Sequence, residues 1–159
     1  MTEVETPGGT AVPAHEVDQV VAGTRLVGGL IAASLANLEQ PLTMPQWRVL
    51  VLAELGICNV SVVAADLGVH MSNATRTCDR LVAAGLLERR RADHDRRQVL
   101  LALTESGQRL YDDAMAFRRR RLEQALVRMH ATDRAELART IGLLVAAAET
   151  AGLTPHDHG

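Results

Sequence analysis

The spacing of apolar and polar positions between residues 72 and 85 predicts a helix with two different faces. Ser72 is the expected N-cap of this helix. Four residues are expected to face inward, and the steps between them are four, three and four positions, the spacing of a buried stripe: Ala74, Cys78, Leu81 and Gly85. The opposite face carries side chains that can hydrogen-bond base edges and phosphates: Asn73, Arg76, Thr77 and Arg80. We interpret this segment as a DNA-reading helix; an ordinary amphipathic helix with a solvated polar face is the alternative.

Two short apolar runs follow this helix and predict a β-hairpin. Gly85 supplies the helix stop, and the strand candidates are LLERRR and QVLLAL. In the charged connection between them, Asp95 stands two residues before Arg97, so that it could pair with Arg97 and hold the tip in shape. An arginine on a narrow hairpin can enter the minor groove of DNA, where the potential is most negative. We interpret the hairpin as a DNA-binding wing, with a solvated hairpin turn as the alternative.

The remaining pattern predicts five more helices. They span about residues 15–38, 45–55 and 62–67, followed by a helix that Thr104 caps and a last one that starts near residue 132. Thr43, with Gln46 three residues later, is the expected cap of the second. The first helix and the last two helices carry more apolar surface than one small winged domain can cover, which predicts dimerisation through residues 15–38 and 105–150. The run Arg118–Arg121 is expected to be a solvated surface, with contact to DNA phosphates as the alternative.

Positive charge is concentrated on the predicted reading region. The whole chain has a formal net charge of −2, yet residues 71–97 hold seven arginines against four acids, while residues 1–40 hold five acids and one base. This distribution is expected when phosphate contacts dominate affinity. Aromatic residues make up only 2% of the chain, whereas single-strand and RNA-binding modules need aromatic platforms for base stacking. Duplex DNA is therefore the expected partner.

Other function classes find little support in the sequence. The chain has no CxxC, HExxH or glycine-rich phosphate loop, so neither an enzyme nor a bound cofactor or metal is expected. The charge-free stretch of thirteen residues at 26–38 is too short to span a bilayer, so no membrane partner is expected. Residues 1–14 lack the features of a signal peptide and are expected to be a disordered arm, and residues 151–159 a flexible tail. The two cysteines suit a reducing cytoplasm.

Taken in order along the chain, these features resemble the MarR (multiple antibiotic resistance regulator) family of winged helix-turn-helix transcription factors. The resemblance covers about residues 17–148 and depends on the order and spacing of short motifs: Leu42, Thr43, Gln46, Trp47, Val49 and Leu50; Thr75 and Arg76; Asp79, Arg80 and Leu81; Gly85, Leu86 and Arg89; Asp95, Arg96 and Arg97; Leu103, Thr104 and Gly107. His70 and Met71 are less usual near the start of the reading helix, which leaves base preference open.

The resemblance implies a mainly α fold with a small β-hairpin wing, a winged helix-turn-helix with a helical dimerisation region. The domain would span residues 15–150, with its DNA-binding part at about 43–104. A homodimer would place two reading heads on successive major grooves of a pseudo-palindromic operator. The expected role of such a dimer is that of a repressor. The residues expected to contact DNA are Ser72, Asn73, Thr75, Arg76, Thr77, Arg80, Arg89, Arg96 and Arg97. The operator, the regulated genes and the sign of regulation are left open.

In the resembling family, small aromatic anions or lipophilic compounds commonly bind between the dimerisation helices and the winged domain. The resemblance implies a small-molecule effector here, with Met44, Trp47 and Arg48 lining its crevice; a core position is the alternative for Trp47. Redox sensing through Cys58 or Cys78 is the alternative mechanism, although Cys78 lies on the inward stripe. Metal sensing would need clustered ligands, and the histidines are dispersed along the chain.

Overall fold

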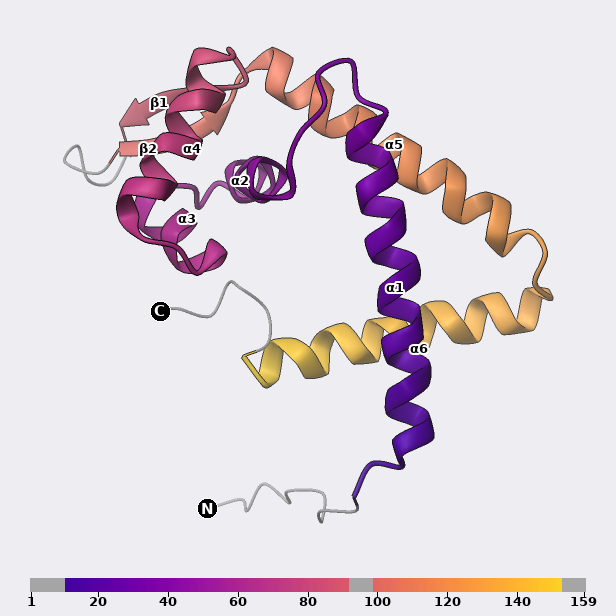
Figure 1. Cartoon of the computed structure of the whole chain (residues 1–159). Helices are drawn as coiled ribbons and strands as arrows, with labels where there is room; N and C mark the ends of the chain where they lie inside the picture. Colours follow the sequence, from indigo (N-terminus) through magenta and orange to yellow (C-terminus); the bar gives the residue numbers. More distant parts are fainter. Residues whose placement is uncertain (1–10, 92–98, 153–159) are drawn as a thin grey trace.

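The computed structural model describes residues 11–91 and 99–152, which form six α-helices and one antiparallel hairpin (Figure 1). The elements follow in the order α1 (Ala14–Ala36), α2 (Met44–Glu54), α3 (Val60–Leu67), α4 (Met71–Ala83), β1 (Leu87–Arg91), β2 (Val99–Leu103), α5 (Glu105–Leu126) and α6 (Ala131–Thr150). Figure 1 shows α2, α3, α4 and the hairpin gathered into one region, which we call the head, while α1, α5 and α6 extend away from it. This is the mainly helical winged helix-turn-helix fold predicted from the sequence.

The core of the head is formed by the inward stripe of α4 and the apolar sides of its neighbours. Ala74, Cys78 and Leu81 are at most 1% exposed, so the predicted buried stripe is confirmed for these three residues. It is wrong for Gly85, which is exposed and follows the end of α4. They belong to one cluster with apolar side chains from α2, α3 and the hairpin, of which the most deeply buried are Val49, Leu50, Leu52, Val63 and Leu87. The backbone N–H of Leu101 on β2 donates to the carbonyl of Cys58 at 2.7 Å and so ties the hairpin to the connection between α2 and α3.

Two of the predicted helix caps are present in the structure. Thr43 accepts the backbone N–H of Gln46 at 3.4 Å, and the Gln46 side chain accepts the backbone N–H of Thr43 at 2.9 Å, which together form a capping box at the start of α2. Thr104 accepts the backbone N–H of Gly107 at 3.0 Å and caps α5. Both caps satisfy N–H groups that have no partner inside their own helix.

Ser72 was the expected N-cap of the reading helix, and this prediction is wrong, because the helix begins two residues earlier. The N-cap of α4 is His70, whose carbonyl accepts the N–H groups of Asn73 and Ala74 at 2.9 and 3.2 Å. Its ring Nδ1 also accepts the N–H of Ser72 at 3.4 Å. Ser72 therefore lies in the first turn of the helix, because an imidazole can supply the acceptor that a serine hydroxyl more commonly provides.

Two glycines help to position the head, Gly68 in a tight turn and Gly107 at a close approach between backbones. Gly68 ends α3 with a φ of 61°, a left-handed conformation that glycine adopts without steric cost, and this makes the tight turn into α4. Gly107 on α5 passes beside the entry to β1, where an added Cβ would lie 2.0 Å from the carbonyl oxygen of Leu86. The start of α5 is thereby held directly against the hairpin.

The helices outside the head leave much of their apolar surface uncovered. No residue of α6 is buried, and its apolar side chains are exposed: Leu137, Ile141, Leu143, Leu144 and Val145. The buried residues of α1 are Ser34 and Leu35, near its C-terminal end, whereas its earlier apolar residues are exposed: Val17, Val20, Val21, Leu26 and Val27. Within residues 11–91 and 99–152, a single chain therefore does not supply enough contacts to cover these two helices.

By length and composition alone, α1 could also cross a membrane. It has 23 residues, and its most apolar window has a mean hydropathy of 1.4 with 11% of that window buried. The helix is longer than the charge-free stretch at residues 26–38 because it also includes Glu16, Asp18 and Arg25. The core helices of soluble proteins, which are mostly buried, pass the same test of length and composition, so one such helix is weak evidence for a membrane segment.

Candidate DNA-binding site

The outer face of α4 presents the polar side chains expected to read DNA. Ser72, Asn73, Arg76 and Arg80 are exposed, on the side opposite the buried stripe. Thr75 and Thr77 are half-buried, and their hydroxyls donate to the carbonyls of Met71 at 2.8 Å and Asn73 at 3.0 Å. The structure thus brings these six candidates onto one helix.

Arg89 on β1 is held against the reading helix. Its guanidinium donates to Asp79 Oδ1 of α4 at 2.5 Å, and both side chains are about half exposed. An ion pair this exposed adds little to stability, typically below about 1 kcal/mol. Its effect is to keep the base of the wing next to α4, where Arg89 lies beside the other candidate DNA contacts.

The predicted tip of the wing lies outside the described residues. Asp95, Arg96 and Arg97 fall between β1 and β2, in the segment for which the structure gives no description. The pairing of Asp95 with Arg97 and the DNA contacts of Arg96 and Arg97 therefore stay predictions from the sequence.

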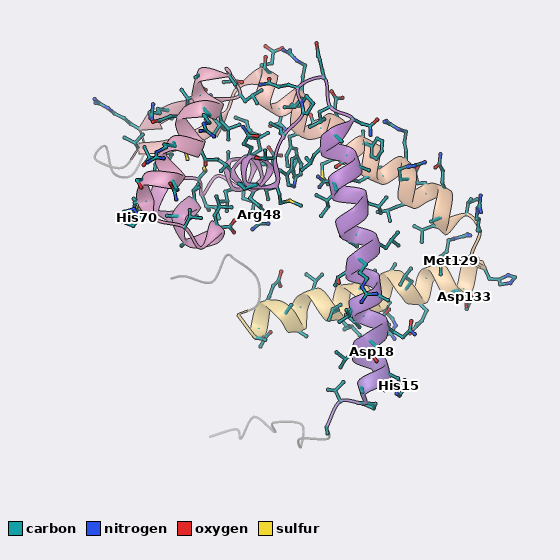
Figure 2. All side chains as sticks on the ribbon, in the orientation of Figure 1. His15, Asp18, Arg48, His70, Met129 and Asp133 are labelled. Carbon is teal, nitrogen blue, oxygen red and sulfur yellow. The ribbon has the colours of Figure 1, made fainter. Side chains whose placement is uncertain are left out.

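His70, the N-cap of α4, is an exposed polar residue next to this face that was not among the residues expected to contact DNA. It is exposed at the N-terminal end of α4, and Figure 2 shows it at the outer side of the head. The signal that could have identified it is its position directly after the glycine turn, where the first free N–H groups of the helix need an acceptor.

The three residues predicted to line an effector crevice have different environments. Met44 is 44% exposed. Trp47 is 3% exposed, with Tyr111 stacked on its ring at 5.1 Å between centroids and the Arg118 guanidinium 4.1 Å from the ring centroid. Arg48 points to α3, where its Nε donates to Asp66 Oδ2 at 3.0 Å, and the Asp66 side chain is 1% exposed. Trp47 thus occupies the core position given as its alternative, and Arg48 serves as an ion-pair partner.

The four arginines of the run Arg118–Arg121 on α5 differ in how deeply they are buried. Arg119, Arg120 and Arg121 are exposed, as expected for a solvated helix surface. Arg118 is half-buried and turned inward, where its Nε donates to Ser34 Oγ on α1 at 2.8 Å, so the expectation is wrong for this residue. A run of identical charges hides this difference, because only the position of each residue around the helix decides which side it faces.

Both cysteine thiols are fully buried in the head. Burial, followed by the nearby Cys78 thiol, raises the pKa of Cys58 to about 12. Burial, and then the charge of Asp79, also raises the pKa of Cys78. A reactive cysteine needs an accessible thiolate, which neither site favours. Within residues 11–91 and 99–152, no group of three or more histidine, cysteine or acidic side chains is arranged to hold a metal ion.

Comparison with known proteins matches the family model described as MarR family to residues 42–99, which include all four helical and strand elements from α2 to β1. The uncharacterized HTH-type transcriptional regulator YfiV of Bacillus subtilis is 33% identical over 87 residues, and the transcriptional repressor MprA of Escherichia coli is 34% identical over 77 residues. These alignments cover 52% and 48% of the chain and 54% and 44% of the two relatives. The chain thus spans about half the length of the curated relatives it matches.

Similarity to solved structures extends beyond the head. Rv1404 from Mycobacterium tuberculosis aligns with a TM-score of 0.72 at 30% identity, covering 87% of this chain and 97% of that one. CouR from Rhodococcus jostii, solved bound to p-coumaroyl-CoA, aligns with a TM-score of 0.56 at 29% identity, covering 82% of this chain and 93% of that one. Alignments of this length include helices outside the head as well as the winged region.

Proposed function

Because the chain belongs to the MarR family, a family of transcription regulators and not of enzymes, we propose that it is a homodimeric repressor that binds a pseudo-palindromic operator in double-stranded DNA. A small aromatic or lipophilic molecule would release it from the operator. A protein with this function would act on chromosomal DNA, so we expect it in the cytoplasm.

The outer face of α4 is the observation that carries this proposal. Arginine and asparagine form bidentate hydrogen bonds with guanine and adenine in the major groove, and Asn73, Arg76 and Arg80 are exposed together on this face. The same helix is anchored by a buried stripe, so these side chains stand on a rigid support. A winged domain used only for protein contacts would not need this set of residues on one outer face.

The homodimer is supported by the uncovered apolar surfaces of α1 and α6. A second copy of the chain is the simplest cover for them, because a symmetric pair buries the same surface twice. Two heads related by a two-fold axis then match two inverted half-sites in the DNA. The repressor role is supported by the similarity to MprA, which is described as a transcriptional repressor.

The effector is supported by the similarity to CouR, which binds p-coumaroyl-CoA. We keep Met44, Trp47 and Arg48 as candidates for the crevice, with entry beside Met44, the exposed residue of the three. Redox sensing through Cys58 or Cys78 is the weaker alternative, because both thiols are buried and have a raised pKa.

The DNA-binding proposal can be tested by fluorescence anisotropy with duplexes taken from the DNA that flanks the gene of this protein. We expect Arg76→Ala and Asn73→Ala each to weaken binding to the bound duplex by about 1–3 kcal/mol, with relaxed base preference at one position. Arg119→Ala, an exposed arginine on α5, is the matched control and should leave that preference unchanged. Equal affinity of the unmodified protein for these duplexes and for unrelated duplexes of the same length would contradict sequence-specific binding.

The effector can be tested on the complex of protein and DNA. We expect release by members of a panel of aromatic acids and their thioesters, and the same release from a Cys58→Ser, Cys78→Ser double variant. Hydroperoxide, zinc and a chelator serve as the comparison treatments. Release by hydroperoxide from the unmodified protein alone would favour redox sensing instead.

A further inference from the structure

The Trp47 ring joins the head to α5 by a clamp. Tyr111 and Arg118 lie seven residues apart on α5, about two turns or 10 Å along one side of the helix. The Trp47 ring of α2 stacks on Tyr111 at 5.1 Å with an angle of 10° between the planes, and the Arg118 guanidinium lies 4.1 Å from the ring centroid. These distances place both α5 side chains directly against the indole ring, which is 3% exposed.

Arg118 also connects this clamp to α1. Its Nε donates to Ser34 Oγ at 2.8 Å, and Ser34, which is 1% exposed, donates in turn to the carbonyl of Ile31 at 2.7 Å. One guanidinium of α5 therefore contacts α2 of the head and α1 of the surrounding helices at the same time. In Figure 1, α1, α2 and α5 come together on the side of the head from which the long helices extend.

Stability alone does not explain an arginine at this position. Its Nη2 is buried without a hydrogen-bond partner, and among the described side chains no carboxylate forms an ion pair with it. Burial lowers the pKa of Arg118, the direction expected for a cation that has lost water without gaining an anion. An apolar side chain of similar length would fill the space without this cost. The guanidinium adds directional contacts, since its planar group stacks on an aromatic face and donates along fixed directions.

We propose that Arg118, together with Trp47 and Ser34, fixes the orientation of the head on the dimerisation helices and thereby sets the spacing of the two half-sites in DNA that the dimer accepts. The inference rests on the proposed function, in which α1, α5 and α6 hold the two copies together. If the dimer is held through these helices, the distance between two reading helices depends on the angle at which each head is attached. Arg118 is thus a positioning residue that contacts no DNA.

The test uses Arg118→Met, which keeps an unbranched side chain and removes the charge and the donors. Duplexes selected by the unmodified protein from a random library define the half-site, and inverted pairs of it are then prepared with the selected spacer or with one base pair more or fewer. We expect Arg118→Met to lower the ratio of affinities between the selected and the altered spacers by about tenfold, a change that binding titrations resolve easily. Its thermal unfolding midpoint should stay equal or rise. Arg119→Met, an exposed neighbour with the same change of charge, should keep the ratio.

Ser34→Ala provides a second, milder variant that removes only the link to α1, and it should lower the same ratio by a smaller factor. An unchanged spacing ratio in both Arg118→Met and Ser34→Ala, with an unmodified protein that discriminates between spacers, would overturn this inference and leave the proposed function intact. A loss of affinity that is equal for all spacers would also overturn it, because Arg118 would then act through stability or phosphate contact. If the unmodified protein selects no duplex with two half-sites, both the inference and the proposed function fail.

Discussion

Among single residues, the buried Cys58 thiol makes the stability of the head sensitive to alkaline pH. Its pKa rises from an ordinary value of 9.0 to about 12 in the folded state, mainly because of burial. Between these two values the unfolded chain has lost the thiol proton while the folded chain keeps it. The stability contributed by the protonated thiol is therefore complete below the unfolded pKa and falls as pH rises, by about 1.4 kcal/mol per pH unit for one group.

We expect urea unfolding to show this fall between about pH 9 and pH 11, with a steeper slope for the unmodified protein than for Cys58→Ala. The alanine variant should be less stable near neutral pH because it leaves a space in the core, but it cannot release this proton. Titrating groups that do not interact with Cys58 act equally in both proteins, so the difference in slope reports on Cys58 and on its coupling to Cys78. Parallel pH profiles for the two proteins would mean that the thiol pKa is not raised.

Among the glycines that the structure describes, Gly107 has the least room for an added methyl group. An alanine there would place its Cβ 2.0 Å from the carbonyl oxygen of Leu86, a backbone atom that cannot swing away as a side chain can. We expect Gly107→Ala to lower the free energy of unfolding by about 1–3 kcal/mol, the range for overpacking. Ser106→Ala, at the exposed preceding position, is the control and should stay within about 0.5 kcal/mol of the unmodified protein in the same urea titration. Equal stability of both variants would show that the hairpin and α5 can separate freely.

At the level of helices and strands, local signals were enough to predict most of the fold. Thr43 and Thr104 were correctly expected to cap their helices, because a cap depends on residues three positions apart in the chain. The buried stripe of α4 followed from periodicity for the same reason. The cap at His70 was missed because the serine two residues later is the more common capping type, and local preference alone does not decide between two neighbouring candidates.

In the candidate site too, features that depend on local spacing could be predicted, whereas contacts between distant residues could not. Residues on one helix, such as Arg76 and Arg80, could be assigned to a common outer face from their spacing alone. The inward position of Arg118 could not be predicted, because its partners Trp47 and Ser34 come from two other helices, and Trp47 is 71 positions away in the sequence. A run of four arginines carries no local sign that one of them packs against an indole. The Arg89 pairing with Asp79 likewise needed the hairpin to be placed against α4.

The wing as an element carries a prediction that still rests on the sequence. Arg96→Ala with Arg97→Ala should weaken operator binding, because arginines at a hairpin tip reach the minor groove and the phosphates. Loss of about 1–3 kcal/mol is expected at the stronger of the two positions, Arg97, while the oligomeric state stays unchanged. Binding measured at physiological salt, with Arg119→Ala as a control for charge, tests this. An unaltered affinity of the double variant would remove the DNA-contact assignment of the hairpin tip.

For the whole molecule, the distribution of apolar surface decides how the chain exists in solution. The head is well packed around its own core, whereas α6 has no buried residue and α1 is buried only near its C-terminal end. Apolar side chains exposed along two long helices are typical of a surface that another molecule covers. Of these two helices, α1 packs against α5, to which the head is attached through Trp47. Dimerisation and placement of the heads therefore depend on one set of contacts.

We expect a dimer at low micromolar concentration in the absence of DNA, and we expect only some of the exposed leucines to be needed for it. Leu144 on α6 and Leu55 at the end of α2 are each 50% exposed in the single chain, so exposure alone does not distinguish them. If a second copy covers α6, Leu144→Asp places a charge in the interface of both protomers and removes about 1.5–3 kcal/mol of burial from each. Sedimentation velocity should then show monomer or aggregate for Leu144→Asp and an intact dimer for Leu55→Asp. A stable monomer of the unmodified chain, or a dimer that Leu55→Asp disrupts and Leu144→Asp does not, would mean that the apolar surface of α6 has another role than joining two copies.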